Sequence, residues 1–221
     1  MNDIRVSRLA ALSGAGFFVL GTIGHFSYPH SPGFMANPPA VQAFYAGHDG
    51  GVLASNTMFL LAGMLLLVFA GVMRTVLARA GETLATIAFG AFVAAGSLMI
   101  ASAAIDMTAA LHVQKRGEIG AQAASTLWDL SQVLFGLAAP MALAVAVLGV
   151  ALATLRHRAL PTWLGATSAV LGVALAIPPI NYVSVVVFTF WALATSLVLA
   201  LRDVPEAGAV LDPAPAAPPA R

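Results

Sequence analysis

The sequence predicts an all-α integral membrane protein with six transmembrane helices arranged in three hairpins. Of its 221 residues, 60% are hydrophobic and only 9% are charged, whereas a soluble domain carries about 25% charged residues. The apolar residues are spread evenly over six separate segments, and arginine residues recur between alternate segments. We therefore expect one polytopic membrane domain, without a separate soluble core.

Each predicted helix is an apolar segment close to the length that crosses a bilayer. About 20 mainly apolar residues are needed to cross roughly 30 Å of hydrocarbon. The fifth segment is the shortest, and Pro178-Pro179 directly after it predicts a tight turn into the sixth. The six segments cover residues 9–28, 52–73, 84–106, 128–155, 162–177 and 182–201.

The first segment has some features of a signal peptide. Arg5 and Arg8 precede an apolar run that begins at Leu9. No small-x-small cleavage site follows, because the run ends in Gly-His-Phe-Ser-Tyr at residues 24–28. We therefore expect a retained first helix.

The basic residues predict the orientation of the chain. With the N-terminus in the cytoplasm, the outer segments contain only Lys115 and Arg116. The cytoplasmic segments then contain Arg5, Arg8, Arg74, Arg79, Arg156, Arg158, Arg202 and Arg221. This distribution satisfies the positive-inside rule in every loop. We expect both termini to be cytoplasmic.

The predicted membrane domain comprises residues 1–202. Its longest outer loop, 29–51, contains a helix-start signal, Asn37 followed by two prolines, and a plausible stop at Gly47. We expect a short interfacial helix there, which lies on the membrane or over the mouth of the bundle. Residues 203–221 are rich in proline and alanine, and we expect them to form a disordered cytoplasmic tail.

Polar residues gather near the outer ends of the predicted helices. They include His25, Asn56, Asp106, Asp129 and Gln132. Ionisable groups within a membrane segment are costly and frequently mark functional sites. If these side chains face inward, they form an outward-facing pocket that binds a small ligand, a lipid or an ion, in transport or in sensing. A histidine beside carboxylates suits proton coupling or cation binding.

Other interpretations of these residues and of the chain remain open. Asp129 could instead cap the fourth helix or lie in the wetted interface. A membrane-embedded enzyme acting on a lipid or isoprenoid could use Asp106 and Asp129 as acid and base. An accessory subunit could pack through glycine-rich helix faces against a larger membrane complex, and a homo-oligomer is a further alternative.

Several classes of function are unsupported. The chain has no cysteine and no basic stripe, which argues against thiolate chemistry and nucleic-acid binding. Its single lysine, Lys115, lies in an outer loop, so a retinal Schiff base within a helix is excluded. His25, His30, His48 and His112 lack metal-ligand spacing. We therefore expect no metal, no cofactor and no catalytic residues.

Short motifs also show a family resemblance. Residues 160–165, Leu-Pro-Thr-Trp-Leu-Gly, open a helix, and Phe44-Tyr45-Ala46 with Gly50-Gly51 precede the second span. In these features the chain resembles uncharacterised six-helix membrane proteins of high-GC, actinobacterial-type bacteria. The resemblance covers the membrane domain and implies the same fold, a bacterial origin and residence in the cytoplasmic (inner) membrane. It implies no activity.

Overall fold

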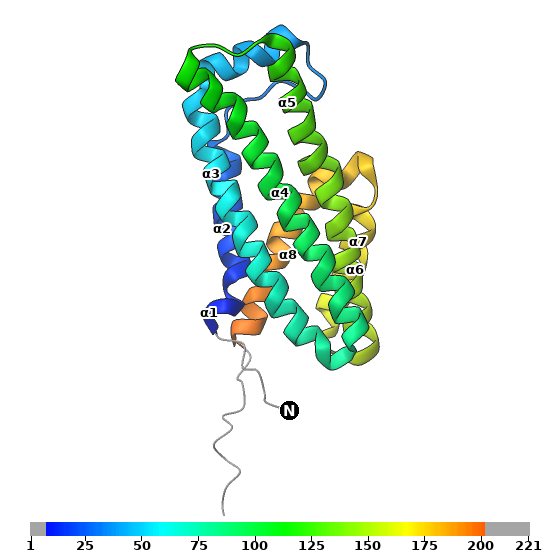
Figure 1. Cartoon of the computed structure of the whole chain (residues 1–221). Coiled ribbons are helices and arrows are strands. Elements are labelled where there is room, and N and C mark those ends of the chain that lie inside the picture. The colour runs from blue at the N-terminus through cyan, green and yellow to red at the C-terminus, as the bar shows by residue number, and fades with distance from the viewer. Residues whose placement is uncertain (1–7, 202–221) are drawn as a thin grey trace, which may run out of the picture.

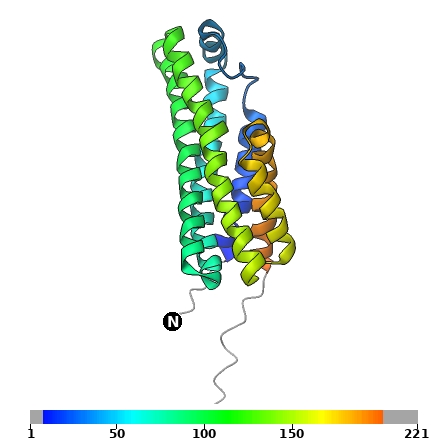
Figure 2. The same cartoon turned by 90° about the vertical axis from the view of Figure 1, so that its right-hand side faces the viewer.

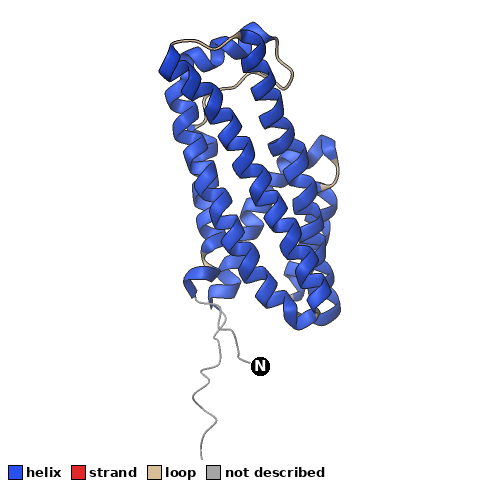
Figure 3. Cartoon of the chain, in the orientation of Figure 1, coloured by secondary structure: helices blue, strands red, loops and turns tan. Residues whose placement is uncertain are grey.

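The predicted helical class is confirmed by the computed structural model, which describes residues 8–201 except for the side chains of residues 179, 181 and 182. These described residues contain helices and connecting loops but no strand (Figure 3). The predictions made for Arg5, Arg202, Arg221 and the tail 203–221 lie outside them.

Long helices run up and down beside one another in a single bundle (Figure 1). We call the end that holds α1 the lower end, and the end that holds the connection between α4 and α5 the upper end. The α-helices are α1 (Arg8–Ala11), α2 (Ser13–Ser27), α3 (Pro38–Leu77), α4 (Glu82–Arg116), α5 (Ala121–Val133), α6 (Ala139–His157), α7 (Thr162–Leu175) and α8 (Asn181–Leu201). Short 3-10 helices follow α3 (Ala78–Ala80) and precede α8 (Pro178–Ile180).

Five helices are long and apolar enough to cross a membrane. They are Arg8–Ser27, Pro38–Ala80, Glu82–Arg116, Ala121–His157 and Val183–Leu201. The remaining predicted span corresponds to α7, an apolar helix of 14 residues. The prediction of a polytopic helical protein is therefore confirmed to the extent of five membrane-compatible helices.

Three helices are longer at the upper end than their apolar segments predict. The expected third span ends at residue 106, yet α4 continues to Arg116 and stops at Gly117, whose φ of 83° is readily available to glycine. The apolar segment marks only the part suited to hydrocarbon, and a helix can continue into water. Asp106 therefore lies about three turns inside α4 and not at its end.

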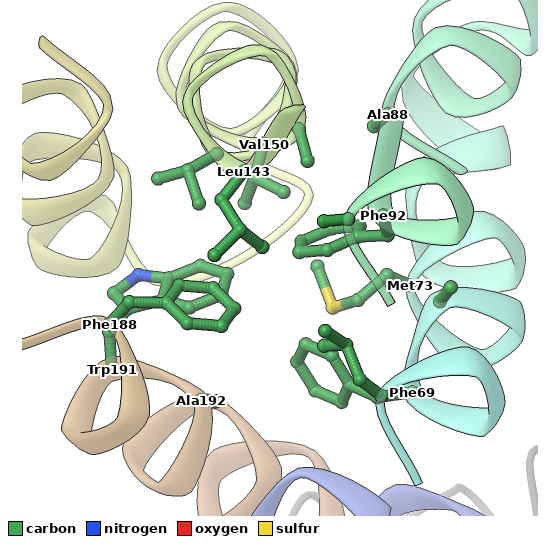
Figure 4. Packing of buried hydrophobic residues seen from close by; sticks show 14 of the residues in the cluster. Phe69, Met73, Ala88, Phe92, Leu143, Val150, Phe188, Trp191 and Ala192 are labelled. Atoms are coloured by element: carbon green, nitrogen blue, oxygen red, sulfur yellow. The ribbon is translucent and has the colours of Figure 1, made fainter. Parts of the chain in front are cut away.

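The lower and middle parts of the bundle contain the main hydrophobic core. Phe69 and Met73 of α3, Phe92 of α4, and Phe188 and Trp191 of α8 are buried side by side there (Figure 4). The rings of Phe188 and Trp191 stack with centroids 5.6 Å apart. The indole Nε1–H of Trp191 donates a hydrogen bond to Ser168 Oγ at 3.0 Å, so its polar atom is paired.

A second, smaller core lies above Asp106. The upper turns of α4 and α5 extend beyond α7 and α8 (Figure 2). We call the first part of α3, residues 38–47, the cap helix. It packs over these turns through Val41, Phe44 and Tyr45, and Trp128 of α5 completes the cluster. The cap helix begins at the predicted signal, because the Asn37 side chain accepts a hydrogen bond from the Ala40 N–H at 2.9 Å.

The fourth predicted span changes its helical winding in the middle. Residues Leu134–Ala138 form a π-helical turn between α5 and α6, and Pro140 is the second residue of α6. Proline lacks an N–H, and its ring clashes with the carbonyl four residues earlier. A widened turn accommodates that ring without breaking the helix, which is why such turns often occur at kinks and functional sites.

Gly14 of α2 lies in close contact with α8 and α3. A Cβ atom built there would lie 2.9 Å from the carbonyl oxygen of Ala192 and 2.9 Å from Phe69 Cδ2. A backbone carbonyl cannot rotate aside as a side chain can. Gly14→Ala should therefore destabilise the bundle by about 1 to 3 kcal/mol, as overpacking does.

Thermal unfolding of the full chain in detergent tests this expectation. The midpoint for Gly14→Ala should fall by about 2 to 4 °C for each kcal/mol lost. Gly21→Ala is the matched control on the same helix, because a Cβ at Gly21 meets nothing within 4 Å. Equal midpoints for the two variants would contradict the proposed packing of α2 against α8.

Candidate functional site

The candidate site is built around the buried carboxylate of Asp106, which is only 4% exposed. Tyr28 Oη donates a hydrogen bond to Asp106 Oδ2 at 2.6 Å, and Asn56 Nδ2 donates to the same oxygen at 2.7 Å. The hydroxyl of Tyr45 donates to Asp106 Oδ1. The carboxylate thus joins α4 to the end of α2 and to two separate parts of α3.

The kink in α3 makes two of these hydrogen bonds compatible. Tyr45 and Asn56 would lie about 16 Å apart along the axis of a straight helix. The backbone is non-helical at His48, with φ −137° and ψ 18°, so the cap helix turns over the upper end of the bundle (Figure 1). Both side chains can then reach one carboxylate.

Among the described residues, Asp106 is paired with hydrogen-bond donors and has no basic partner. An ionised carboxylate is purely an acceptor, and it offers about four lone-pair positions. Three of these are used by Tyr28, Tyr45 and Asn56. The only ion pair within residues 8–201 joins Arg74 and Glu82, near the connection between α3 and α4. Within the described part of the chain, the side chains that donate hydrogen bonds to Asp106 are therefore all neutral.

Tyr28 is held in its protonated, donating form by its surroundings. Burial raises the pKa of its hydroxyl well above the ordinary value, and the adjacent negative charge of Asp106 and the hydrogen bond to it raise that pKa further. The hydroxyl therefore donates to Asp106 at every physiological pH.

Asp106 lines a cavity of about 320 Å³ below the cap helix. The loop after α2 contributes Pro29, His30 and Ser31 to its wall. The rest of the lining comes from α2, α3, α4, α5 and the π-helical turn: His25, Tyr28, Asn56, Phe59, Met99, Ser102, Ala103, Asp106, Ser131, Gln132 and Phe135. The lining thus combines polar and apolar side chains.

Two serines fix the wall between α4 and α5. Ser102 Oγ donates a hydrogen bond to the Ser131 carbonyl at 2.8 Å, and Ser131 Oγ donates to the Trp128 carbonyl at 2.8 Å. Both serines are buried. The bond from Ser102 joins α4 to α5, one residue before Gln132 in the sequence, and the bond from Ser131 lies within α5.

The structure brings four of the five predicted ligand residues to this cavity. His25, Asn56, Asp106 and Gln132 all line it. Asp129 is not among the lining residues, and its Oδ1 is buried without a hydrogen-bond partner among the described residues. An acid–base pair of Asp106 and Asp129 across one cavity is therefore not what the geometry shows.

No family model, no curated protein and no solved structure matches this chain. The resemblance to six-helix bacterial membrane proteins stays a prediction. What can be said about the cavity residues therefore comes from their geometry and chemistry.

Sequence reasoning missed several contributors to the site, among them both hydroxyl donors of Asp106. Tyr28 and Tyr45 are the hydroxyl donors of Asp106, and His30 lines the cavity. The chain has only three tyrosines. One of them, Tyr28, directly precedes the long outer loop 29–51, and another, Tyr45, lies within it. That concentration is a usable signal for polar partners of a buried acid, although only the fold shows which acid they bind.

The described residues do not gather a metal-binding cluster. Within residues 8–201, no three histidine, aspartate or glutamate side chains approach one another closely enough to hold a metal ion. Among the histidines considered as ligands, His25 and His30 line the cavity. His48 stacks on the ring of Phe44, with its Nδ1 3.0 Å from the Phe44 carbonyl oxygen.

The raised pKa of Tyr28 predicts a loss of stability at high pH. Above the ordinary tyrosine pKa of about 10, the unfolded chain releases the Tyr28 proton while the folded chain keeps it. The folded state then binds more protons, so the free energy of unfolding falls as pH rises. Tyr28→Phe should remove this contribution, and its stability should fall less steeply above pH 10.

Thermal midpoints in detergent, compared between pH 8 and pH 11, provide the measurement. At the lower pH, Tyr28→Phe should already be less stable by about 0.5 to 3 kcal/mol, because Asp106 loses one donor. Thr108→Val is a control, since the Thr108 hydroxyl is exposed and bonds only to a carbonyl of its own helix, at 2.8 Å. Identical pH dependence in wild type and Tyr28→Phe would refute the pairing of Tyr28 with Asp106.

Proposed function

We propose that this chain is a six-span protein of a bacterial inner membrane that binds a small, positively charged ligand in an outward-facing cavity, for transport or sensing. One observation carries the proposal: the Asp106 carboxyl group, 4% exposed, lines a 320 Å³ cavity, and its hydrogen-bond donors among the described residues are all neutral.

The course of the chain around α7 supports the proposal of six spans. The connection between α6 and α7 lies at the lower end of the bundle, and α8 also ends there (Figure 1). Because α8 is long enough to span, the chain must return to the upper side before α8 begins. Only α7, about 21 Å long, is available for that crossing. A short helix can be accommodated by local thinning of the bilayer.

The described basic residues support cytoplasmic termini. Five arginines occupy α1 and the two lower connections, where α3 meets α4 and α6 meets α7: Arg8, Arg74, Arg79, Arg156 and Arg158. Lys115 and Arg116 lie in the last turn of α4, at the upper end. The positive-inside rule places the lower end in the cytoplasm. The Asp106 cavity then opens toward the outside.

The charge of the cavity favours a cation. Its lining contains neither lysine nor arginine, and removing a carboxylate from water is costly unless something compensates its charge. Three neutral donors provide part of that compensation, and one lone-pair position of Asp106 is left for a ligand. A cation placed there would form a charge-assisted hydrogen bond, which is stronger than a neutral one.

Among the alternative functions, binding agrees best with the geometry. An enzyme using Asp106 and Asp129 as acid and base needs both groups at one cavity, and only Asp106 lines it. An accessory subunit that acts only through its helix faces needs no internal cavity. Assembly of a ligand-binding chain into a homo-oligomer or a larger membrane complex is compatible with the proposal.

The proposed topology predicts opposite labelling of two single cysteines. The chain contains no cysteine, so each introduced thiol is unique. Glu118→Cys, in the connection between α4 and α5, should react with a membrane-impermeant maleimide in intact cells. Arg79→Cys, in the connection between α3 and α4, should react only after the membrane is permeabilised. Both positions are exposed. Labelling of Arg79→Cys in intact cells would reverse the orientation and overturn the outward-facing cavity.

The proposed cation site predicts that binding depends on Asp106. Equilibrium dialysis of the full chain in detergent against radiolabelled butylammonium measures the affinity directly. Asp106→Asn keeps the shape of the side chain but removes its charge, so the affinity should fall by about tenfold or more, the range of one charged hydrogen bond. Asp129→Asn is the matched control, because Asp129 lies outside the cavity lining, and its affinity should stay within about twofold of wild type.

Two further measurements keep this test decisive if Asp106→Asn is unstable. Tyr28→Phe leaves the carboxylate in place, and it should retain butylammonium binding with at most a modest change. Butyrate, of similar size and opposite charge, should not compete. The proposal would be contradicted if a folded Asp106→Asn variant bound butylammonium as tightly as wild type. It would also be contradicted if butyrate competed for the site as well as unlabelled butylammonium does.

A further inference from the structure

An apolar groove of about 230 Å³ adjoins the Asp106 cavity. Gly21, Thr22 and Phe26 of α2 form one wall, and Val185, Val186, Thr189 and Phe190 of α8 form the other. His25, Phe59 and Phe135 line both the groove and the cavity. The two spaces therefore meet at these three side chains.

The outer side of the groove reaches the surface of the bundle. Phe26 is 82% exposed, Phe190 is 56% exposed and Val186 is 42% exposed. In a membrane, a surface of this kind faces the acyl chains of lipids. The groove thus opens sideways into hydrocarbon, whereas the cavity carries the polar groups and the charge.

The boundary between cavity and groove is formed mainly by two aromatic rings. The centroids of Phe59 and Phe135 lie 5.9 Å apart, with their planes inclined by 51°. Phe135 belongs to the π-helical turn Leu134–Ala138, so the widened winding before Pro140 sets the position of its ring. A linear chain passing between cavity and groove would lie against these rings.

We propose that the ligand is a single-chain amphiphile with a protonated amine head and an alkyl tail. The head binds Asp106 in the cavity, and the tail lies in the groove between α2 and α8. The ligand enters sideways from the membrane, so that its tail never crosses water. This inference rests on the proposed function, that the Asp106 cavity binds a cation, and it adds the class of ligand.

The combination of the two spaces excludes simpler occupants. A small inorganic cation would leave the apolar groove unused. An anionic amphiphile would bring its charge to Asp106, where like charges repel. A lipid tail alone would fill the groove without contacting the carboxylate. Only a molecule with a cationic head and an apolar chain matches both the charge of the cavity and the lining of the groove.

The test compares two alkylammonium ions on the full chain in phosphatidylcholine nanodiscs. Binding of radiolabelled butylammonium and octylammonium is measured and corrected for uptake by protein-free discs. Each methylene buried in the groove should improve affinity by up to about fourfold. Octylammonium should therefore bind wild type at least about tenfold more tightly than butylammonium, since four more methylenes are available for burial.

One variant fills the groove and leaves the carboxylate untouched. Gly21 lines the groove, and a Cβ there meets nothing within 4 Å, so Gly21→Leu should fold. It should reduce the advantage of octylammonium to about threefold or less while butylammonium binds as before. Gly90→Leu is the matched control, because Gly90 is equally unobstructed and lines neither space. It should keep the full chain-length dependence.

The outcomes separate this inference from the proposed function. If both amines need Asp106 but bind equally well, the cation site stands and the amphiphile is excluded. If Gly21→Leu and Gly90→Leu show the same chain-length dependence, the groove does not hold the tail and the inference is overturned. If octanoate binds as tightly as octylammonium, the inference that the ligand has a cationic head group is contradicted. If neither amine binds, the proposed function itself fails.

Discussion

The upper half of this molecule depends on keeping one carboxylate out of water. Asp106 lies between two hydrophobic clusters, the main core below and the smaller core under the cap helix above. A charge in that position is costly unless donors surround it. Tyr28, Tyr45 and Asn56 supply these donors. Meeting that requirement fixes where α2 ends, how far α3 folds back at His48 and which face of α4 points inward.

The general fold was predictable, because long apolar segments have few other solutions than helices in a membrane. The helix signal at Asn37 was also readable, since a cap is a local interaction. The helix lengths could not be predicted in the same way, because α4 continues past its apolar part and packs against residues that are distant in the sequence. The pairing of Tyr28 and Tyr45 with Asp106 spans 78 and 61 residues. No spacing rule within a single helix could reveal it.

Of the polar residues predicted from the sequence as ligand-binding, four line the cavity and one does not. His25, Asn56, Asp106 and Gln132 lie at one cavity, because their helices present the same level of the bundle to its interior. Asp129 lies about one turn before Gln132 on α5 and is not among the residues that line the cavity. Depth along a helix can be estimated from the sequence at 1.5 Å per residue. The rotation of one helix about its axis depends on contacts such as those of Ser102 with α5.

The central claim is that the side-chain carboxyl group of Asp106 contacts a cationic ligand. Infrared difference spectra of the full chain, recorded with and without octylammonium, test it most directly. The account predicts a shifted carboxylate stretching band in wild type that disappears in Asp106→Asn and persists in Asp129→Asn. A wild-type spectrum in which saturating octylammonium leaves every carboxylate band unchanged would contradict it.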